Sequence, residues 1–271
     1  MAKIKWKQLL VGEFSWKRFV RSILFIYASV SIYLFFGADR MIFLPPTPTY
    51  QDSANIIKLE TRDGERISAT YFPNFSATYT ILYAHGNNED LGQILPVLLN
   101  LNELGFGVFA YDYRGYGTSE GKPSERNAYE DIDAAYVYLT QTLEIPPDRI
   151  IVYGRSVGGG SAIDLASRQP VAGLVVESSF VTAFRVVTRI PIFPFDKFSN
   201  LEKIKRVDCP VLVMHGTADE VIPFWHGQQL FEAVQTPKKS LWIADAGHQN
   251  LKDIAGDRYE KALENFIQNI P

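Results

Sequence analysis

The sequence predicts an α/β fold in which a mostly parallel, twisted sheet carries helices on both faces. Two observations point to this class. Short apolar runs, rich in β-branched residues and poor in polar alternation, recur along the chain and end in small or polar residues, as strands buried on both faces do. Segments with helical spacing separate several of these runs, and such an order of strands and helices favours a parallel sheet.

The first element is a predicted hairpin, because residues 55–72 form two alternating runs around Asp63-Gly64, a strong turn signal. The predicted parallel strands follow as the runs TILYAHG, GVFAYDYRG, IIVYG, GLVVESS, PVLVMHG and SLWIADAG. Helices are predicted over residues 128–142, 225–234 and 256–270, the last of these amphipathic. Ligands bind such sheets at the carboxyl ends of the strands, so the residues after each strand are the candidates for function.

Composition narrows the function classes. The chain has 271 residues, of which 46% are hydrophobic, as expected for one large globular domain. The single cysteine, Cys209, excludes an intramolecular disulfide but leaves the compartment open. Residues 1–45 hold seven Lys and Arg against two acidic residues, whereas the remainder holds 20 against 28. An acidic main domain does not favour nucleic acid as a partner.

The amino-terminal region predicts a membrane anchor. Ser22 to Ala38 contains no charge, and 17 helical residues span about 25 Å, close to a hydrocarbon core. Six Lys and Arg precede this run, so the positive-inside rule predicts a single-pass protein with a cytoplasmic amino terminus and the main domain on the opposite side. A cleaved signal peptide and an interfacial helix remain alternatives. We expect residues 1–45 to form the anchor region, with its helix at about 20–38, and residues 46–271 to form the main domain.

Gly154-Arg155-Ser156-Val157-Gly158 follows the run IIVY and carries the main chemical signal. A sharp turn from strand to helix lifts a serine hydroxyl toward substrate, and it needs small neighbours two residues away. Glycines at 154 and 158 meet that need. Because the motif lies between a buried strand and a helix, it predicts that Ser156 is a nucleophile rather than part of an ordinary glycine-rich turn.

The serine needs a base and an acid. Of the four histidines, His248 follows the last predicted strand, in a loop at the carboxyl end of the sheet, and is the predicted base. Asp219 and Glu177 each follow a strand and are the candidates to orient His248. Glu220 and Asp245 are less suitable, because Glu220 is adjacent to Asp219 and Asp245 precedes the histidine by only three residues.

An oxyanion hole would complete the chemistry. We expect one donor to be the backbone N–H of Val157, directly after the nucleophile, and the other to be that of Asn87, in the loop after TILYA. His85, which opens this loop, is expected to brace it.

The ordered motifs HGNNEDLG, DYRGYGTSEG, GRSVGGG, HGTADEVIP and AGHQNL resemble those of the α/β hydrolase superfamily, in its serine-hydrolase branch. The sequence is similar to membrane-anchored, serine aminopeptidase-like hydrolase-domain proteins. The resemblance implies the α/β hydrolase fold and favours Asp219 over Glu177, giving the triad Ser156, Asp219 and His248. Some relatives remove acyl chains from proteins but carry a cysteine-rich amino terminus, which this sequence lacks.

The predicted function is therefore serine hydrolysis of an ester or thioester, on a lipid or acylated substrate near a membrane. A peptidase and a non-catalytic binding protein are the alternatives. The short segment at about 180–207 is the predicted lid, and its apolar residues, among them Phe184, Ile190, Phe193 and Phe195, either pack on the core or line an acyl-chain groove. No metal cluster or nucleotide fingerprint appears in the sequence, so no cofactor is expected. The oligomeric state is not predicted.

Overall fold

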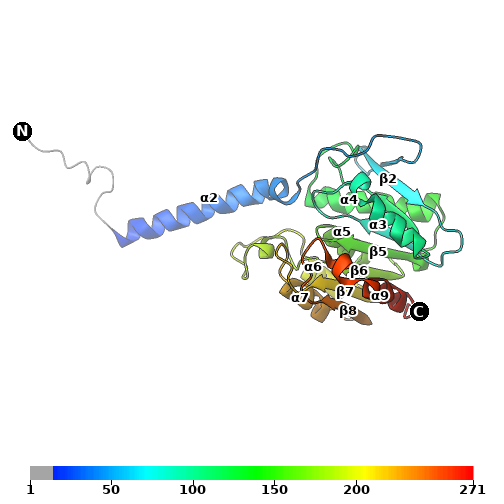
Figure 1. Ribbon diagram of the computed structural model, residues 1–271. Helices are drawn as coiled ribbons and strands as arrows, with labels where there is room; N and C mark the ends of the chain where they lie inside the picture. Colours follow the sequence, from blue (N-terminus) through cyan, green and yellow to red (C-terminus); the bar gives the residue numbers. More distant parts are fainter. Residues whose placement is uncertain (1–14, 271) are drawn as a thin grey trace, which may run out of the picture. The chain divides into compact units, whose positions relative to one another are not determined.

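The computed structural model describes residues 15–270, and these divide into two compact units with the boundary between Ala38 and Asp39 (Figure 1). Helix α2, Trp16–Ile42, starts in the first unit and ends in the second. Its length and composition would allow it to cross a membrane, and a signal sequence would meet the same criteria. The basic residues Lys3, Lys5 and Lys7 lie outside the described residues.

The second unit is built on an eight-stranded sheet within the described residues. Its strands are β1 Ile57–Glu60, β2 Arg66–Phe72, β3 Thr80–Ala84, β4 Gly107–Tyr111, β5 Ile150–Arg155, β6 Gly173–Glu177, β7 Val211–Gly216 and β8 Lys238–Ile243. Their order in space is β1-β2-β4-β3-β5-β6-β7-β8. The pairs β1–β2 and β2–β4 are antiparallel, and every other neighbouring pair is parallel. The predicted fold class is therefore confirmed, including the amino-terminal hairpin.

The hairpin turns where the sequence indicates. Gly64 has a φ of +86°, and its N–H donates to the carbonyl of Thr61 at 2.9 Å. Glycine adopts this left-handed conformation without a steric cost, so the turn closes at Asp63-Gly64. The hairpin adds an antiparallel edge to the parallel sheet.

Helices cover both faces of the sheet, as predicted (Figure 1). The longer helices of the second unit are α3 Leu91–Glu103, α4 Glu125–Val137, α5 Gly158–Ala166, α7 Trp225–Ala233, α8 Leu251–Ala255 and α9 Asp257–Ile267. Shorter turns are η1 Tyr138–Thr142, η2 Pro147–Arg149, η3 Phe184–Val186, α6 Asn200–Lys203 and η4 Ile204–Arg206. The helix predicted at 128–142 starts earlier, at Glu125, where Ser124 caps it, and its last five residues form a π-helical turn.

Two apolar cores lie on the two sides of the sheet, because neighbouring strand residues point to opposite faces. Leu82, Val152 and Leu174 pack on the side of α4, α5 and α7. The adjacent Ile81, Ile151 and Val175 pack on the side of α3, α8 and α9. Because β3 to β8 are parallel, the loops after these strands emerge at one edge, where the candidate site lies.

Candidate active site

Ser156 lies in the turn between β5 and α5 with a φ of +54°, a strained conformation for a residue with a side chain. Its N–H donates to the Glu177 carbonyl at 2.9 Å, and its own carbonyl accepts the Ser179 hydroxyl at 2.8 Å. These bonds hold the serine in a conformation that is otherwise disfavoured. The turn aims the Ser156 side chain away from the sheet, toward the loops at its carboxyl edge.

Glycine is required on both sides of this turn. A Cβ at Gly154 would lie 2.5 Å from the Gly158 carbonyl oxygen, and a Cβ at Gly158 would lie 2.6 Å from that of His85. Both distances are well below van der Waals contact. Gly154 thus lets β5 pass close to the first turn of α5, and Gly158 lets the serine turn pack directly against the end of β3 and the loop that follows it.

The structure brings Ser156, His248 and Asp219 together from three separate loops. His248 Nε2 lies 3.1 Å from Ser156 Oγ, and His248 Nδ1 lies 2.8 Å from Asp219 Oδ2. The three residues are 8%, 4% and 6% exposed. Nδ1 faces a carboxylate and therefore carries the proton, so Nε2 is free to accept the serine proton.

Backbone donors hold Asp219 in place. Its Oδ1 accepts the N–H groups of Val221 at 3.0 Å and Ile222 at 2.7 Å, leaving Oδ2 for His248. Burial opposes ionisation of Asp219, but hydrogen bonds from His215 and His248 outweigh it and keep the pKa of the carboxyl below its usual range. The carboxylate is therefore ionised at neutral pH and can stabilise an imidazolium.

The competing acid, Glu177, has other partners. Its carboxylate accepts hydrogen bonds from Tyr153 and from Tyr259, the latter at 2.9 Å, and lies 3.4 Å from Arg155 Nε. Glu220 is exposed, and the N–H of Asp245 donates to Thr217 Oγ1 at 3.0 Å. Asp219 is the acid that contacts His248 in this geometry.

The loop after β3 lies beside the serine turn. Within residues 15–270, neither the Asn87 N–H nor the Val157 N–H donates a hydrogen bond to another protein group. Two such donors near a nucleophile could bind a developing oxyanion. The side chain of Asn87 is engaged elsewhere, with Ile42, Leu44 and Tyr116.

His85 is buried and braces this loop. Its Nδ1 donates to the Gly86 carbonyl at 2.7 Å, and its Nε2 lies 3.2 Å from Asp112 Oδ1. Burial lowers the pKa of His85, but the hydrogen bond and charge of Asp112 outweigh it, and the net shift is upward.

The other two histidines support neighbouring loops. His215 Nε2 lies 2.8 Å from the Ile222 carbonyl and 3.4 Å from Asp219 Oδ2, so it is a second contact of the acid. His226 Nδ1 accepts the Val181 N–H at 3.2 Å, and burial lowers its pKa to about 4. His226 is therefore neutral at pH 7.

Sequence reasoning missed an ionic clamp around the nucleophile. Arg155 Nη1 pairs with Glu89, and Glu89 Oε2 accepts the Gly86 N–H at 2.8 Å. Arg155 Nη2 donates to the His248 carbonyl at 3.2 Å and to Gln249 Oε1 at 2.7 Å. Arg155 thus ties the His248 loop to the loop after β3. No local signal could have shown this, because Arg155 occupies a variable position of G-x-S-x-G.

The segment 180–207 lies between β6 and β7 and exposes apolar side chains. Val187, Ile190 and Ile192 are 89%, 67% and 48% exposed. Phe184, Phe193 and Phe195 are partly buried, with ring centroids 5.8 to 6.0 Å apart. The aromatic rings therefore pack on one another, whereas the aliphatic side chains present an apolar rim to solvent.

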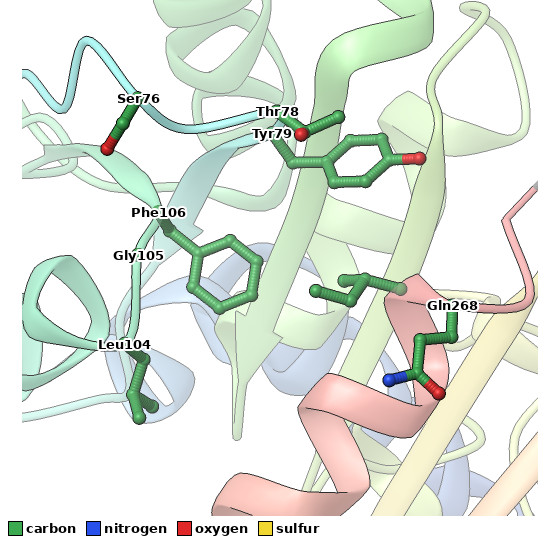
Figure 2. Close-up of a pocket in the computed structure, with 8 residues that line it drawn as sticks. Ser76, Thr78, Tyr79, Leu104, Gly105, Phe106 and Gln268 are labelled. Carbon is green, nitrogen blue, oxygen red and sulfur yellow. The ribbon is translucent and has the colours of Figure 1, made fainter.

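A cavity of about 320 Å³ lies elsewhere, where β3 and β4 begin (Figure 2). Figure 2 shows Tyr79, Phe106 and Gln268 among the lining residues, and Gln268 directly follows α9. Its remaining lining residues are Ser76, Thr78, Leu104, Gly105 and Ile267. Because it opens at the amino ends of the strands, it is separate from the site around Ser156. Among residues 15–270, no group of three His, Cys, Asp or Glu is arranged to hold a metal ion.

The topology described above, a parallel sheet with an antiparallel edge and a serine turn after its central strand, defines the α/β hydrolase class. Residues 76–195 match the sequence profile of the family described as serine aminopeptidase, S33, and residues 191–270 match that of the prolyl oligopeptidase family. The chain is 36% identical to alpha/beta hydrolase domain-containing protein 17B of Xenopus tropicalis, over 85% of this chain and 90% of that protein. It is 38% identical to alpha/beta hydrolase domain-containing protein aho-3 of Caenorhabditis elegans, over 84% and 77% of the two chains.

Solved structures agree in fold. An esterase of Pyrococcus furiosus superposes with a TM-score of 0.71 at 19% identity, covering 84% of this chain and 99% of the esterase. An α-β serine hydrolase homologue from Coxiella burnetii gives a TM-score of 0.60 at 18% identity, covering 82% and 100%. The chain belongs to the family of alpha/beta hydrolase domain-containing proteins 17, and it is a hydrolase of that family.

Proposed function

We propose that the chain is a serine hydrolase that cleaves an ester or thioester through an acyl-enzyme. Ser156 Oγ attacks the carbonyl carbon while His248 Nε2 takes the hydroxyl proton, and Asp219 stabilises the resulting imidazolium. The N–H groups of Asn87 and Val157 bind the oxyanion. The tetrahedral intermediate then expels the alcohol or thiol, which leaves with the proton from His248. Water activated by His248 hydrolyses the acyl-enzyme and regenerates Ser156.

The observation that carries this proposal is the continuous contact from Asp219 through His248 to Ser156, at 2.8 and 3.1 Å. A non-catalytic protein that only retained the fold would have no need of this geometry or of the strained φ at Ser156. A peptidase remains the second candidate, because the matching sequence profiles are described as peptidase families.

We propose a lipid or acylated substrate, since the apolar rim formed by Val187, Ile190 and Ile192 lies on the segment 180–207, which we interpret as a short lid. An exposed apolar rim on a segment that follows β6 suits an acyl chain attached to a polar group.

The deciding experiment measures fluorophosphonate labelling, and hydrolysis of an ester and thioester panel of increasing acyl length, for wild type and Ser156→Ala. We expect only the wild type to be labelled and to turn over substrate, with rates that rise with acyl length. Equal labelling of the two proteins would overturn the serine mechanism. Preference for short soluble esters would overturn the acyl substrate, and faster cleavage of aminoacyl amides would favour the peptidase.

We also propose that residues 1–45 are the anchor region, with α2 crossing a membrane, and that residues 46–271 form the hydrolase domain on the side opposite a cytoplasmic amino terminus. Lys17, Arg18 and Arg21 lie near the start of α2, and cytoplasmic ends of membrane helices are enriched in such residues. A buried core helix is not favoured, since the apolar window of α2 is 0% buried.

The anchor predicts that the full chain stays with membranes in alkaline carbonate. In sealed vesicles with the cytoplasmic face outward, added protease should remove an amino-terminal tag and leave the hydrolase domain intact. Extraction by carbonate would disprove the spanning helix. Digestion of the hydrolase domain would show that it lies on the cytoplasmic face, opposite to the proposed orientation.

A further inference from the structure

The end of helix α2 and the chain that follows it are bound to the loop that carries Asn87. We call residues 39–50 the exit segment and residues 85–90 the oxyanion loop. Both belong to the second compact unit. The exit segment has the sequence DRMIFLPPTPTY, and its prolines suggest a stiff connection rather than a part of the site. Three groups of contacts, however, bind the exit segment to the oxyanion loop and its neighbours.

The first contact is centred on the Asn87 side chain. Asn87 Oδ1 accepts the Leu44 N–H at 2.8 Å, and Asn87 Nδ2 donates to the Ile42 carbonyl at 2.7 Å. The Tyr116 hydroxyl donates to Asn87 Oδ1 at 2.6 Å and lies 3.0 Å from the Leu44 nitrogen. One amide side chain is therefore bonded to two backbone groups of the exit segment and to a buried tyrosine.

The second contact holds the far end of the oxyanion loop. The Thr49 N–H donates to Asp90 Oδ2 at 2.7 Å, and the Thr49 hydroxyl donates to the other carboxylate oxygen. The Tyr50 hydroxyl donates to Asp112 Oδ2 at 2.6 Å, and Asp112 faces His85. Both ends of the oxyanion loop are thus bonded, directly or through Asp112, to the exit segment.

The third contact is apolar and ionic. Phe43 is buried, with its ring centroid 6.0 Å from Phe198 and 6.2 Å from Tyr113. Asp39 forms an ion pair with Lys197 at 3.1 Å, and it accepts the N–H of Glu125 at 3.2 Å. The exit segment therefore also fastens the segment 180–207 beside the site.

We propose that the exit segment is a positioning element of the oxyanion hole, acting through the side chains of Asn87 and Tyr116. The proposal rests on the serine-hydrolase function above. A donor stabilises an oxyanion only if its direction is fixed before the reaction. Asn87 is followed by Asn88 at a φ of +59°, so its peptide lies in a tight turn. The bonds from Asn87 to Ile42 and Leu44 hold that turn against the chain that leaves α2.

The consequence is a link between anchoring and catalysis. The Asn87 side chain is bonded to Ile42, the last residue of α2, and to Leu44, two residues further on. Displacement of the helix end would therefore turn the Asn87 peptide. Hydrolysis of even a small soluble ester is therefore expected to depend on the exit segment.

The test uses the full chain in phosphatidylcholine vesicles with p-nitrophenyl acetate as the probe. Tyr116→Phe removes the bridging hydroxyl and keeps the ring, and Leu44→Pro removes the N–H that Asn87 accepts. We expect kcat per fluorophosphonate-labelled site to fall about tenfold for Tyr116→Phe and up to about 100-fold for Leu44→Pro, with KM changed less than about threefold, as for a weakened oxyanion hole.

Matched controls separate positioning from general damage. Leu44→Ala keeps the N–H, and Tyr136→Phe removes a hydroxyl that donates to the Pro170 carbonyl at 2.8 Å; both should keep the wild-type kcat. A boronic acid that forms a tetrahedral adduct with serine should lose affinity in proportion to kcat, whereas the product acid should not.

The possible results are distinct. An unchanged kcat per labelled site in Tyr116→Phe and Leu44→Pro, or equal losses in the controls, overturns the positioning role and leaves the serine mechanism standing. Counting labelled sites removes the effect of misfolded protein. If wild type and Ser156→Ala react alike with the fluorophosphonate, the proposed function itself fails.

Discussion

Asp219→Asn is expected to lower kcat by about 10³ to 10⁴ while leaving the protein folded. The carboxylate holds His248 Nδ1 at 2.8 Å, and an amide at this position can present its NH2 group to the ring instead. The imidazole would then carry its proton on Nε2, the wrong nitrogen for accepting the proton of Ser156. Steady-state hydrolysis of p-nitrophenyl acetate, normalised to folded protein by circular dichroism, measures the loss.

Glu177→Gln is the matched control, because Glu177, the last residue of β6, is the other acid at the carboxyl end of a strand next to the site. Its side chain bonds to Tyr153 and Tyr259, so we expect its loss to change kcat by less than about tenfold. The opposite ranking, with Glu177→Gln the more damaging of the two, would show that Asp219 is not the residue that orients His248.

Gly158→Ala is expected to destabilise the domain by about 3 kcal/mol and to abolish labelling of Ser156. The added methyl would meet the backbone carbonyls of Ala84 and His85, and backbone at the end of a central strand cannot move aside as a flexible side chain does. For a domain of this size, that loss corresponds to a decrease of roughly 10 °C in Tm. Thermal unfolding followed by circular dichroism gives the value.

Gly64→Ala is the control for Gly158→Ala, because it replaces a glycine whose added Cβ would meet no neighbouring atom. Gly64 has a φ of +86° but nothing lies within 4 Å of an added Cβ, so alanine there should cost about 1 to 2 kcal/mol and preserve labelling. Equal Tm decreases and retained activity in both variants would mean that the serine turn and the loop after β3 are not in close contact.

The sequence predicted the features that depend on neighbouring residues. Strands β3 to β7 are continuous apolar runs because they are buried on both faces, so their composition reveals them. The serine turn was predictable for the same reason, since glycines on either side of Ser156 allow the sharp bend. Helix α3 was not predicted, although Asp90 and Gln93 form a capping box that could have marked its start.

Contacts between distant parts of the chain were beyond the reach of sequence patterns. His215 lies near the end of β7 and His248 follows β8, and only the folded structure shows that His248 bonds to Ser156 while His215 lies against Asp219. The clamp of Arg155 with Glu89 joins residues 66 positions apart. None of these contacts has a characteristic spacing along the sequence, because loops of any length can bring such side chains together.

The amino acid order specifies the strands, the serine turn and the apolar helix, since each depends on local sterics or on the periodicity of burial. The choice of partner for each polar side chain depends on the packing of the whole sheet. Asn87 illustrates the difference: its place after β3 follows from sequence, but its bond to Leu44 joins residues 43 positions apart across the edge of the sheet. In our proposal, that bond makes the exit from the apolar helix part of the candidate site.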